Sequence, residues 1–156
     1  MIELVTSGEN REEIYKNLKP QLKELFKDES DMIANLANFA AAIKQCFNFF
    51  WVGFYLVKNN ELVLGPFQGP IACSRISYGK GVCGRAWELG KALIVSDVNS
   101  FPGHISCNSA SKSELVIPLV HKDEVWAILD IDHSEIQAFS ELDKFYLSEL
   151  LALIPI

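Results

Sequence analysis

The sequence lacks the features that mark membrane, secreted and nucleic-acid-binding proteins. No apolar run reaches the length that spans a bilayer, and the opening MIELVTSGENREEIY has no charged segment followed by an apolar one. Basic residues are in the minority, with 14 Lys and Arg against 20 Asp and Glu, for a net charge of -6. A nucleic-acid partner would require a basic stripe. We therefore expect a cytoplasmic protein that binds neither membrane nor nucleic acid.

Repeats, low-complexity segments and linkers are also missing. The 156 residues are 49% hydrophobic and 22% charged, which predicts a single domain over residues 1–156. A chain of this length buries a full core without disulfide bridges. In a reducing compartment its four cysteines are expected to be catalytic, metal-binding or simply buried.

Two helices are predicted before the first strand. Apolar residues recur at helical spacing over residues 9–26, where Pro20 predicts a kink or a break. A polar stretch, residues 28–31, then separates this helix from a second one that continues to residue 46. Either Ser30 or Asp31 is expected to cap the second helix.

The middle of the chain is predicted to form strands. Asn59-Asn60 and the polar segment 121–124 each predict the turn of a hairpin. The predicted elements are strands at 48–57, 61–69, 71–77, 92–97, 114–120 and 125–133, a short helix at 81–90 closed by Gly90, and a final helix at 139–154 capped by Ser140. Helices first, strands in the middle and a helix last predict an α+β fold. Its central sheet would be mostly antiparallel and flanked by N-terminal and C-terminal helices.

Asp130 and Asp132 are two residues apart on a predicted strand and therefore share a face. If they lie near buried surface they repel each other, and at least one titrates at high pH. Such a pair grips a cation or supplies a proton. The commoner alternative is a strand that has reached solvent, and the spacing alone leaves both readings open.

Trp51 and Tyr55 also share a face, with Gly53 between them. A glycine between two aromatic residues predicts a gap that accepts a small apolar group, as in an aromatic cage. The more common arrangement is an ordinary aromatic core with the glycine at a bulge.

The cysteines differ in their surroundings. Cys46 lies at a helix end and is expected to fill the core, whereas Cys83 follows a glycine-rich turn near a helix start, which favours a lowered thiol pKa. Cys107 lies in the polar loop FPGHISCNSASKSE, where functional residues concentrate. No two cysteines have CxxC spacing, which argues against a zinc ribbon or a thioredoxin-like centre. A looser zinc site made of His104 and three cysteines stays open.

Three segments carry a family resemblance: GPFQGPIACSRISYGKGVCGRAW, VSDVNSFPGHISCNSASKSELVIPL and ILDIDHSEIQAFSELD. They resemble the free methionine-(R)-sulfoxide reductases, a catalytic branch of the GAF-domain fold, and the similarity runs from NFFWVGFY to the last helix. The FPGHIxC(N/D) loop followed by SELVIP is specific to that branch, and most GAF domains lack the three cysteines. Asn108 stands after Cys107 where many relatives have aspartate.

The resemblance implies a thiol mechanism on free methionine-(R)-sulfoxide. It places the nucleophile at Cys107, the resolving thiol at Cys73, and a further or alternative partner at Cys83. It implies thioredoxin as the reductant and requires neither a cofactor nor a metal. Relatives of this kind are often dimers, so a homodimer is compatible with it.

The resemblance also assigns a substrate pocket. An acidic pocket suits a free amino acid, whose ammonium group is absent from a methionine within a protein. The implied pocket residues are Glu114, Asp130, Asp132, Trp51 and Tyr55. The alternative from another functional class is a non-catalytic GAF module that senses a small ligand or a redox signal.

Overall fold

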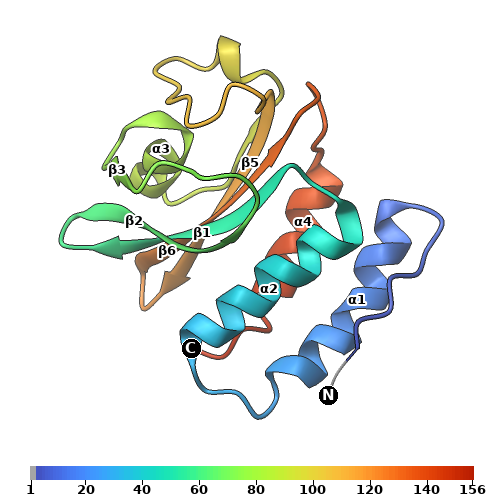
Figure 1. Ribbon diagram of the computed structural model, residues 1–156. Helices are drawn as coiled ribbons and strands as arrows, with labels where there is room; N and C mark the ends of the chain where they lie inside the picture. The colour runs from blue at the N-terminus through green and yellow to red at the C-terminus, as the bar shows by residue number, and fades with distance from the viewer. Residues whose placement is uncertain (1–2) are drawn as a thin grey trace.

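The computed structural model describes residues 3–156, which form one sheet with helices on both faces (Figure 1). Three helices cover one face: α1 (Arg11–Phe26), α2 (Met32–Phe47) and α4 (Glu141–Leu151). The other face carries α3 (Gly81–Leu89) and the long loop that contains the short helix η1 (Val98–Ser100). Within residues 3–156 no helix combines the length and apolarity that a bilayer crossing requires.

The sheet has six strands in the order β3-β2-β1-β6-β5-β4, and every neighbouring pair is antiparallel. The strands are β1 (Trp51–Lys58), β2 (Glu61–Gln68), β3 (Arg75–Ser77), β4 (Leu93–Val95), β5 (Ser113–His121) and β6 (Glu124–His133). The predicted α+β fold with an antiparallel sheet and terminal helices is confirmed.

Both predicted hairpins are present, and each turn uses two residues with positive φ. Asn59 and Asn60 have φ of 50° and 63°, and Lys122 and Asp123 have φ of 49° and 64°. Two consecutive left-handed residues give the backbone twist that joins antiparallel strands through a tight turn.

The predicted break at Pro20 is wrong, because Pro20 lies inside α1. Leu18 and Leu22, on either side of it, are buried in the core, and this packing outweighs the local helix-breaking tendency of proline. Of the two predicted caps for α2, Asp31 is the one used, and its carboxylate accepts a 2.9 Å hydrogen bond from the amide of Ala34.

The two faces of the sheet bury separate apolar clusters. On β5, Leu115 and Ile117 point into the larger cluster, under α1, α2 and α4. Val116 lies in the smaller cluster, under α3, together with Trp51 and Tyr55 of β1. This smaller cluster is interrupted by polar groups, and these form the candidate site.

Candidate active site

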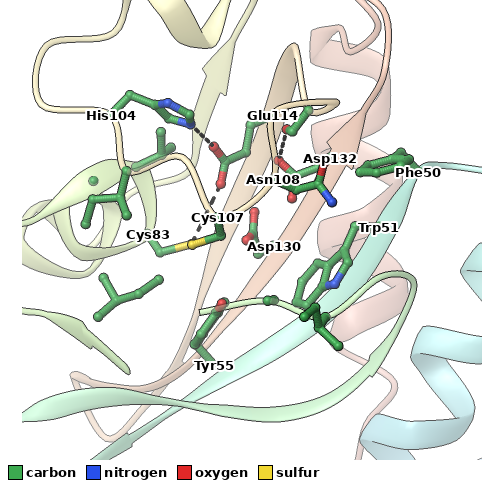
Figure 2. Close-up of a pocket in the computed structure, with 17 residues that line it drawn as sticks. Phe50, Trp51, Tyr55, Cys83, His104, Cys107, Asn108, Glu114, Asp130 and Asp132 are labelled. Atoms are coloured by element: carbon green, nitrogen blue, oxygen red, sulfur yellow. Dashed lines mark hydrogen bonds and ion pairs between the residues drawn. The ribbon is translucent and has the colours of Figure 1, made fainter. Parts of the chain in front are cut away.

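Strand register brings three carboxylates onto the α3 face of the sheet. On the central strand β6, Asp132 pairs with Glu114 of β5 and with Trp51 of β1, while Asp130 pairs with Gly53 of β1. Residues two apart share a face, so the three acids project to the same side. Figure 2 shows them converging on one cavity.

The carboxylates are withdrawn from solvent. Glu114 is 5% exposed and Asp130 is 6% exposed, so the reading in which the aspartate strand has simply reached water is wrong for Asp130. Burial, followed by the negative charge of Asp130, raises the pKa of Glu114 and of Asp132 well above the usual range of each. Burial also raises the pKa of Asp130. The prediction that at least one of the paired aspartates titrates high is confirmed.

Neighbouring side chains contact two of the three acids. The hydroxyl of Ser111 donates a 2.6 Å hydrogen bond to Oδ1 of Asp132. The thiol of Cys83 lies 3.8 Å from Oε1 of Glu114, and Nε2 of His104 lies 3.9 Å from Oε2 of the same residue. Burial lowers the pKa of His104, which favours its neutral form.

Asp130 differs from the other two acids at one oxygen atom. Its Oδ1 atom is buried and has no hydrogen-bond partner among the residues that the structure describes. A buried acceptor without a partner is costly, and a ligand that donates to it removes that cost.

Cys83 lies in the first turn of α3, as predicted, but the expected lowering of its pKa is wrong. The thiol is buried against Glu114 and Asp130, and burial together with these carboxylates raises its pKa well above the usual value. Desolvation and like charge therefore outweigh the helix N-terminus here.

Cys73 and Cys107 form a disulfide, with a Cα–Cα distance of 5.4 Å. Cys73 does not lie in a strand as predicted, because β3 begins only at Arg75. It belongs to the segment before β3, and its carbonyl accepts a 2.9 Å hydrogen bond from the hydroxyl of Tyr55. The disulfide between Cys73 and Cys107 therefore joins the loop that contains Cys107 to the segment that precedes β3.

The aromatic pair lines the cavity, but without the gap that Gly53 suggested. A Cβ at Gly53 would collide with the indole of Trp51 and with Phe67, so the ring of Trp51 already covers that space. The ring centroids of Trp51 and Tyr55 are 6.1 Å apart with an interplanar angle of 25°. The two rings therefore form part of the cavity wall.

The cavity has a volume of about 50 Å³, which accommodates a few water-sized groups and suits a small ligand. Its polar lining comes from the three acids, His104, Ser111, Asn108 and the cysteines, and its apolar lining from Trp51, Tyr55 and several aliphatic side chains. Among residues 3–156, no Lys or Arg lines it. The chain thus supplies negative charge to the cavity without a formal counter-charge.

Comparisons with known proteins identify relatives that share this fold over nearly the whole chain. The GAF domain family matches residues 27–156. A curated Escherichia coli protein, "Free methionine-R-sulfoxide reductase", is 42% identical over 92% of this chain and 87% of its own. "GAF domain-containing protein A" of Dictyostelium discoideum is 54% identical over 97% of each chain. The X-ray structure of free methionine-R-sulfoxide reductase from Neisseria meningitidis in complex with its substrate superposes with a TM-score of 0.96. It has 46% identity over 98% of this chain and 93% of that one.

This chain belongs to the GAF-domain free methionine-R-sulfoxide reductase family. In this protein, all eight predicted site residues line the cavity or border it. Trp51, Tyr55, Cys83, Cys107 and the three acids line it, and Cys73 is bonded to Cys107 at its edge.

Sequence reasoning missed several lining residues of this reductase-family cavity. Ser111 and Ile105 come from the Cys107 loop, and Phe50 precedes β1. The signal available for Ser111 was its place in the same polar loop, three residues before Glu114. Phe50 and Ile105 carry no such signal, because an apolar residue at a cavity rim looks like any other core residue.

The structure also bears on the predictions made for Cys46 and for a zinc site. Cys46 packs half-buried against the larger core and its Sγ lies 3.5 Å from the hydroxyl of Thr6, away from the cavity. The suggested zinc set of His104 with three cysteines is not assembled, since Cys73 and Cys107 are bonded to each other.

Proposed function

We propose that this chain reduces free L-methionine-(R)-sulfoxide to L-methionine. The observation that carries the proposal is the Cys73–Cys107 disulfide at the edge of a cavity lined by three acids and no basic residue. Two of the relatives support the same substrate: the free methionine-R-sulfoxide reductase of Escherichia coli and that of Neisseria meningitidis, whose structure was solved in complex with its substrate.

Cys107 is the proposed nucleophile. Its thiolate attacks the sulfoxide sulfur while an acid protonates the sulfoxide oxygen. The oxygen then passes to the sulfur of Cys107 as the S–O bond of the substrate breaks, which releases methionine and leaves Cys107 as a sulfenic acid. The thiol of Cys73 then attacks the sulfenic sulfur and displaces water, which gives the disulfide. Methionine sulfoxide is reduced by two electrons, and the two thiols are oxidised by the same two. The 5.4 Å between the Cα atoms of the two cysteines supports this pairing.

The carboxylates account for the choice of a free amino acid. A buried anionic pocket without a basic residue requires its ligand to bring positive charge, and the α-ammonium of methionine sulfoxide does so. The unpartnered Oδ1 of Asp130 is an acceptor for one of its N–H groups. A methionine within a protein has a neutral amide at that place and leaves the acids uncompensated.

One acid of the trio acts as the proton donor to the sulfoxide oxygen. Burial and the charge of Asp130 raise the pKa values of Glu114 and Asp132, which favours a proton on the cluster that can hydrogen-bond the sulfoxide oxygen. We assign this role to Glu114 or Asp132, and the aromatic wall of Trp51 and Tyr55 to the S-methyl group. Backbone amides of the Cys107 loop hold the substrate carboxylate.

The disulfide must be reduced before another turnover. We propose that thioredoxin does this by dithiol exchange, in which its two thiols are oxidised as Cys73 and Cys107 are restored. In this scheme Cys83 is a reserve partner for Cys107. The competing idea of a module that only senses a small ligand would leave the paired cysteines without a role.

The test offers the dithiol-reduced protein both sulfur epimers of methionine sulfoxide, each as the free amino acid and as the N-acetyl derivative. We expect methionine from the free (R) epimer alone, and none with Cys107→Ser. Equal turnover of free and N-acetylated (R) epimers would contradict the ammonium argument. Binding without any methionine would favour the sensing module.

A further inference from the structure

A thiol and two carboxylates from three different elements meet beside the cavity. Cys83 of α3, Glu114 of β5 and Asp130 of β6 each offer one ligand atom, and these atoms all lie within 4.8 Å of one another. Figure 2 shows the three side chains pointing toward a common centre. In the proposed reaction Cys83 does not attack the substrate, so its burial among acids is unexplained by that reaction.

Asp130 supplies a second observation that points to a ligand at this centre. The residue is 6% exposed, faces the cavity, and leaves Oδ1 without a hydrogen-bond partner among the described residues. Buried acceptors are otherwise nearly always satisfied.

We propose that Cys83, Glu114 and Asp130 form a binding site for a divalent zinc ion. In tetrahedral zinc sites with Zn–S near 2.3 Å and Zn–O near 2.0–2.2 Å, sulfur and oxygen ligands are about 3.5 Å apart. The sulfur of Cys83 is 3.8 Å from Oε1 of Glu114, so the pair needs only a small contraction. One thiolate with two carboxylates suits zinc, since magnesium and calcium prefer oxygen ligands alone.

The fourth position of such an ion faces the cavity. Asp130 is also the acid assigned above to the substrate's ammonium, and Glu114 is one of the two acids proposed to protonate the sulfoxide oxygen, so zinc and the amino acid exclude each other. Zinc is therefore an inhibitor of the site, and this consequence rests on the proposed function. The binding of zinc by Cys83, Glu114 and Asp130 does not rest on the proposed function.

The first test titrates Co²⁺, a spectroscopic substitute for zinc, into protein whose Cys73–Cys107 disulfide is intact. Cys83 and Cys46 are then the only free cysteines. We expect a cobalt–thiolate charge-transfer band together with the strong visible bands of tetrahedral Co²⁺, and loss of both when Zn²⁺ is added. No band in the wild-type protein would overturn the proposal.

Two near-isosteric variants and one control locate the site. Cys83→Ser is expected to abolish the charge-transfer band, and Asp130→Asn to weaken Co²⁺ binding by more than about 100-fold, since even outer partners are worth 10- to 100-fold. Cys46→Ser is expected to bind as the wild type does. Circular dichroism checks that each variant is folded. A band that survives in Cys83→Ser, or is lost in Cys46→Ser, would place the metal elsewhere and overturn the proposal.

The last arm separates the metal site from the proposed function. Free methionine is expected to raise the apparent dissociation constant for Co²⁺, and N-acetylmethionine to leave it unchanged. A charge-transfer band that methionine does not affect would support the metal site and contradict the assignment of the ammonium to these acids.

Discussion

Gly53 of β1 lies directly opposite Asp130 of β6, and the indole of Trp51 covers the place where a side chain at residue 53 would stand. The glycine thus leaves room for the ring of Trp51, which lines the same cavity as Asp130. The ring of Trp51 is fixed from its other edge by a 3.0 Å hydrogen bond from Nε1 to the carbonyl of Pro70. A movement of the Trp51 ring or of the backbone at Gly53 would therefore change the wall of the cavity.

Replacing Gly53 with alanine is expected to destabilise the protein. The added methyl group would collide with Trp51 and with Phe67, and overpacking of this kind costs about 1–3 kcal/mol. Urea unfolding of Gly53→Ala measures the loss. The control is Gly65→Ala on β2, where the nearest atoms are 3.1 to 3.5 Å from the new methyl group and a smaller loss is expected. Equal losses would argue against the close approach of Trp51.

Asp130→Asn is expected to lower kcat/KM for free methionine-(R)-sulfoxide by about 10- to 150-fold. This corresponds to one charged hydrogen bond of about 1.5–3 kcal/mol between the carboxylate and the substrate ammonium. Discrimination against the N-acetyl derivative should shrink by the same factor. Glu124→Gln, an exposed acid on the same strand, is the matched control and should behave as the wild type does. Unchanged discrimination in Asp130→Asn would exclude Asp130 as the ammonium partner.

Cys73→Ser is expected to stop the reaction after about one turnover per protein when thioredoxin is the reductant. Without the resolving thiol the sulfenic acid of Cys107 persists and can be trapped with dimedone and detected by mass spectrometry. Cys46→Ser, which changes a thiol outside the cavity, should turn over as the wild type does. Sustained turnover of Cys73→Ser would transfer the resolving role to Cys83.

The unliganded protein is expected to lose stability as the pH rises above about 4.5. A carboxyl group whose pKa is higher in the folded state than in the unfolded state binds more protons when folded, so the free energy of unfolding falls as pH climbs through that interval. Glu114, Asp130 and Asp132 all have raised pKa values, against usual values of 4.5 for glutamate and 3.8 for aspartate. His104 acts with the opposite sign near its usual value of 6.5, because burial lowers its pKa.

Urea midpoints between about pH 5 and about pH 8 measure this dependence. Glu114→Gln removes one of the raised groups and should give a flatter decline than the wild type. Saturating methionine should also flatten it, since the ammonium group favours the charged carboxylates. A steeper decline in Glu114→Gln would contradict the raised pKa of this residue.

Features with a local cause were predictable from the sequence. The Asn59-Asn60 turn and the apolar stripes of the helices depend on neighbouring residues, and the paired aspartates share a face by strand period alone. The register that sets Glu114 beside Asp132 depends on the packing of strands far apart in sequence, which no local pattern encodes. The errors share this origin. Pro20 was tolerated, and the thiol of Cys83 was kept protonated, because of tertiary surroundings.

The Cys73–Cys107 bond joins residues separated by 34 positions and so encloses β3, α3, β4 and η1 in a covalent ring. Closing a ring of this size lowers the conformational entropy of the unfolded chain. In the chain-entropy treatment this stabilises the folded protein by about 3–4 kcal/mol. The disulfide-bonded protein is therefore expected to unfold at a higher temperature than the reduced protein, which is the form that reacts with substrate in the proposed mechanism.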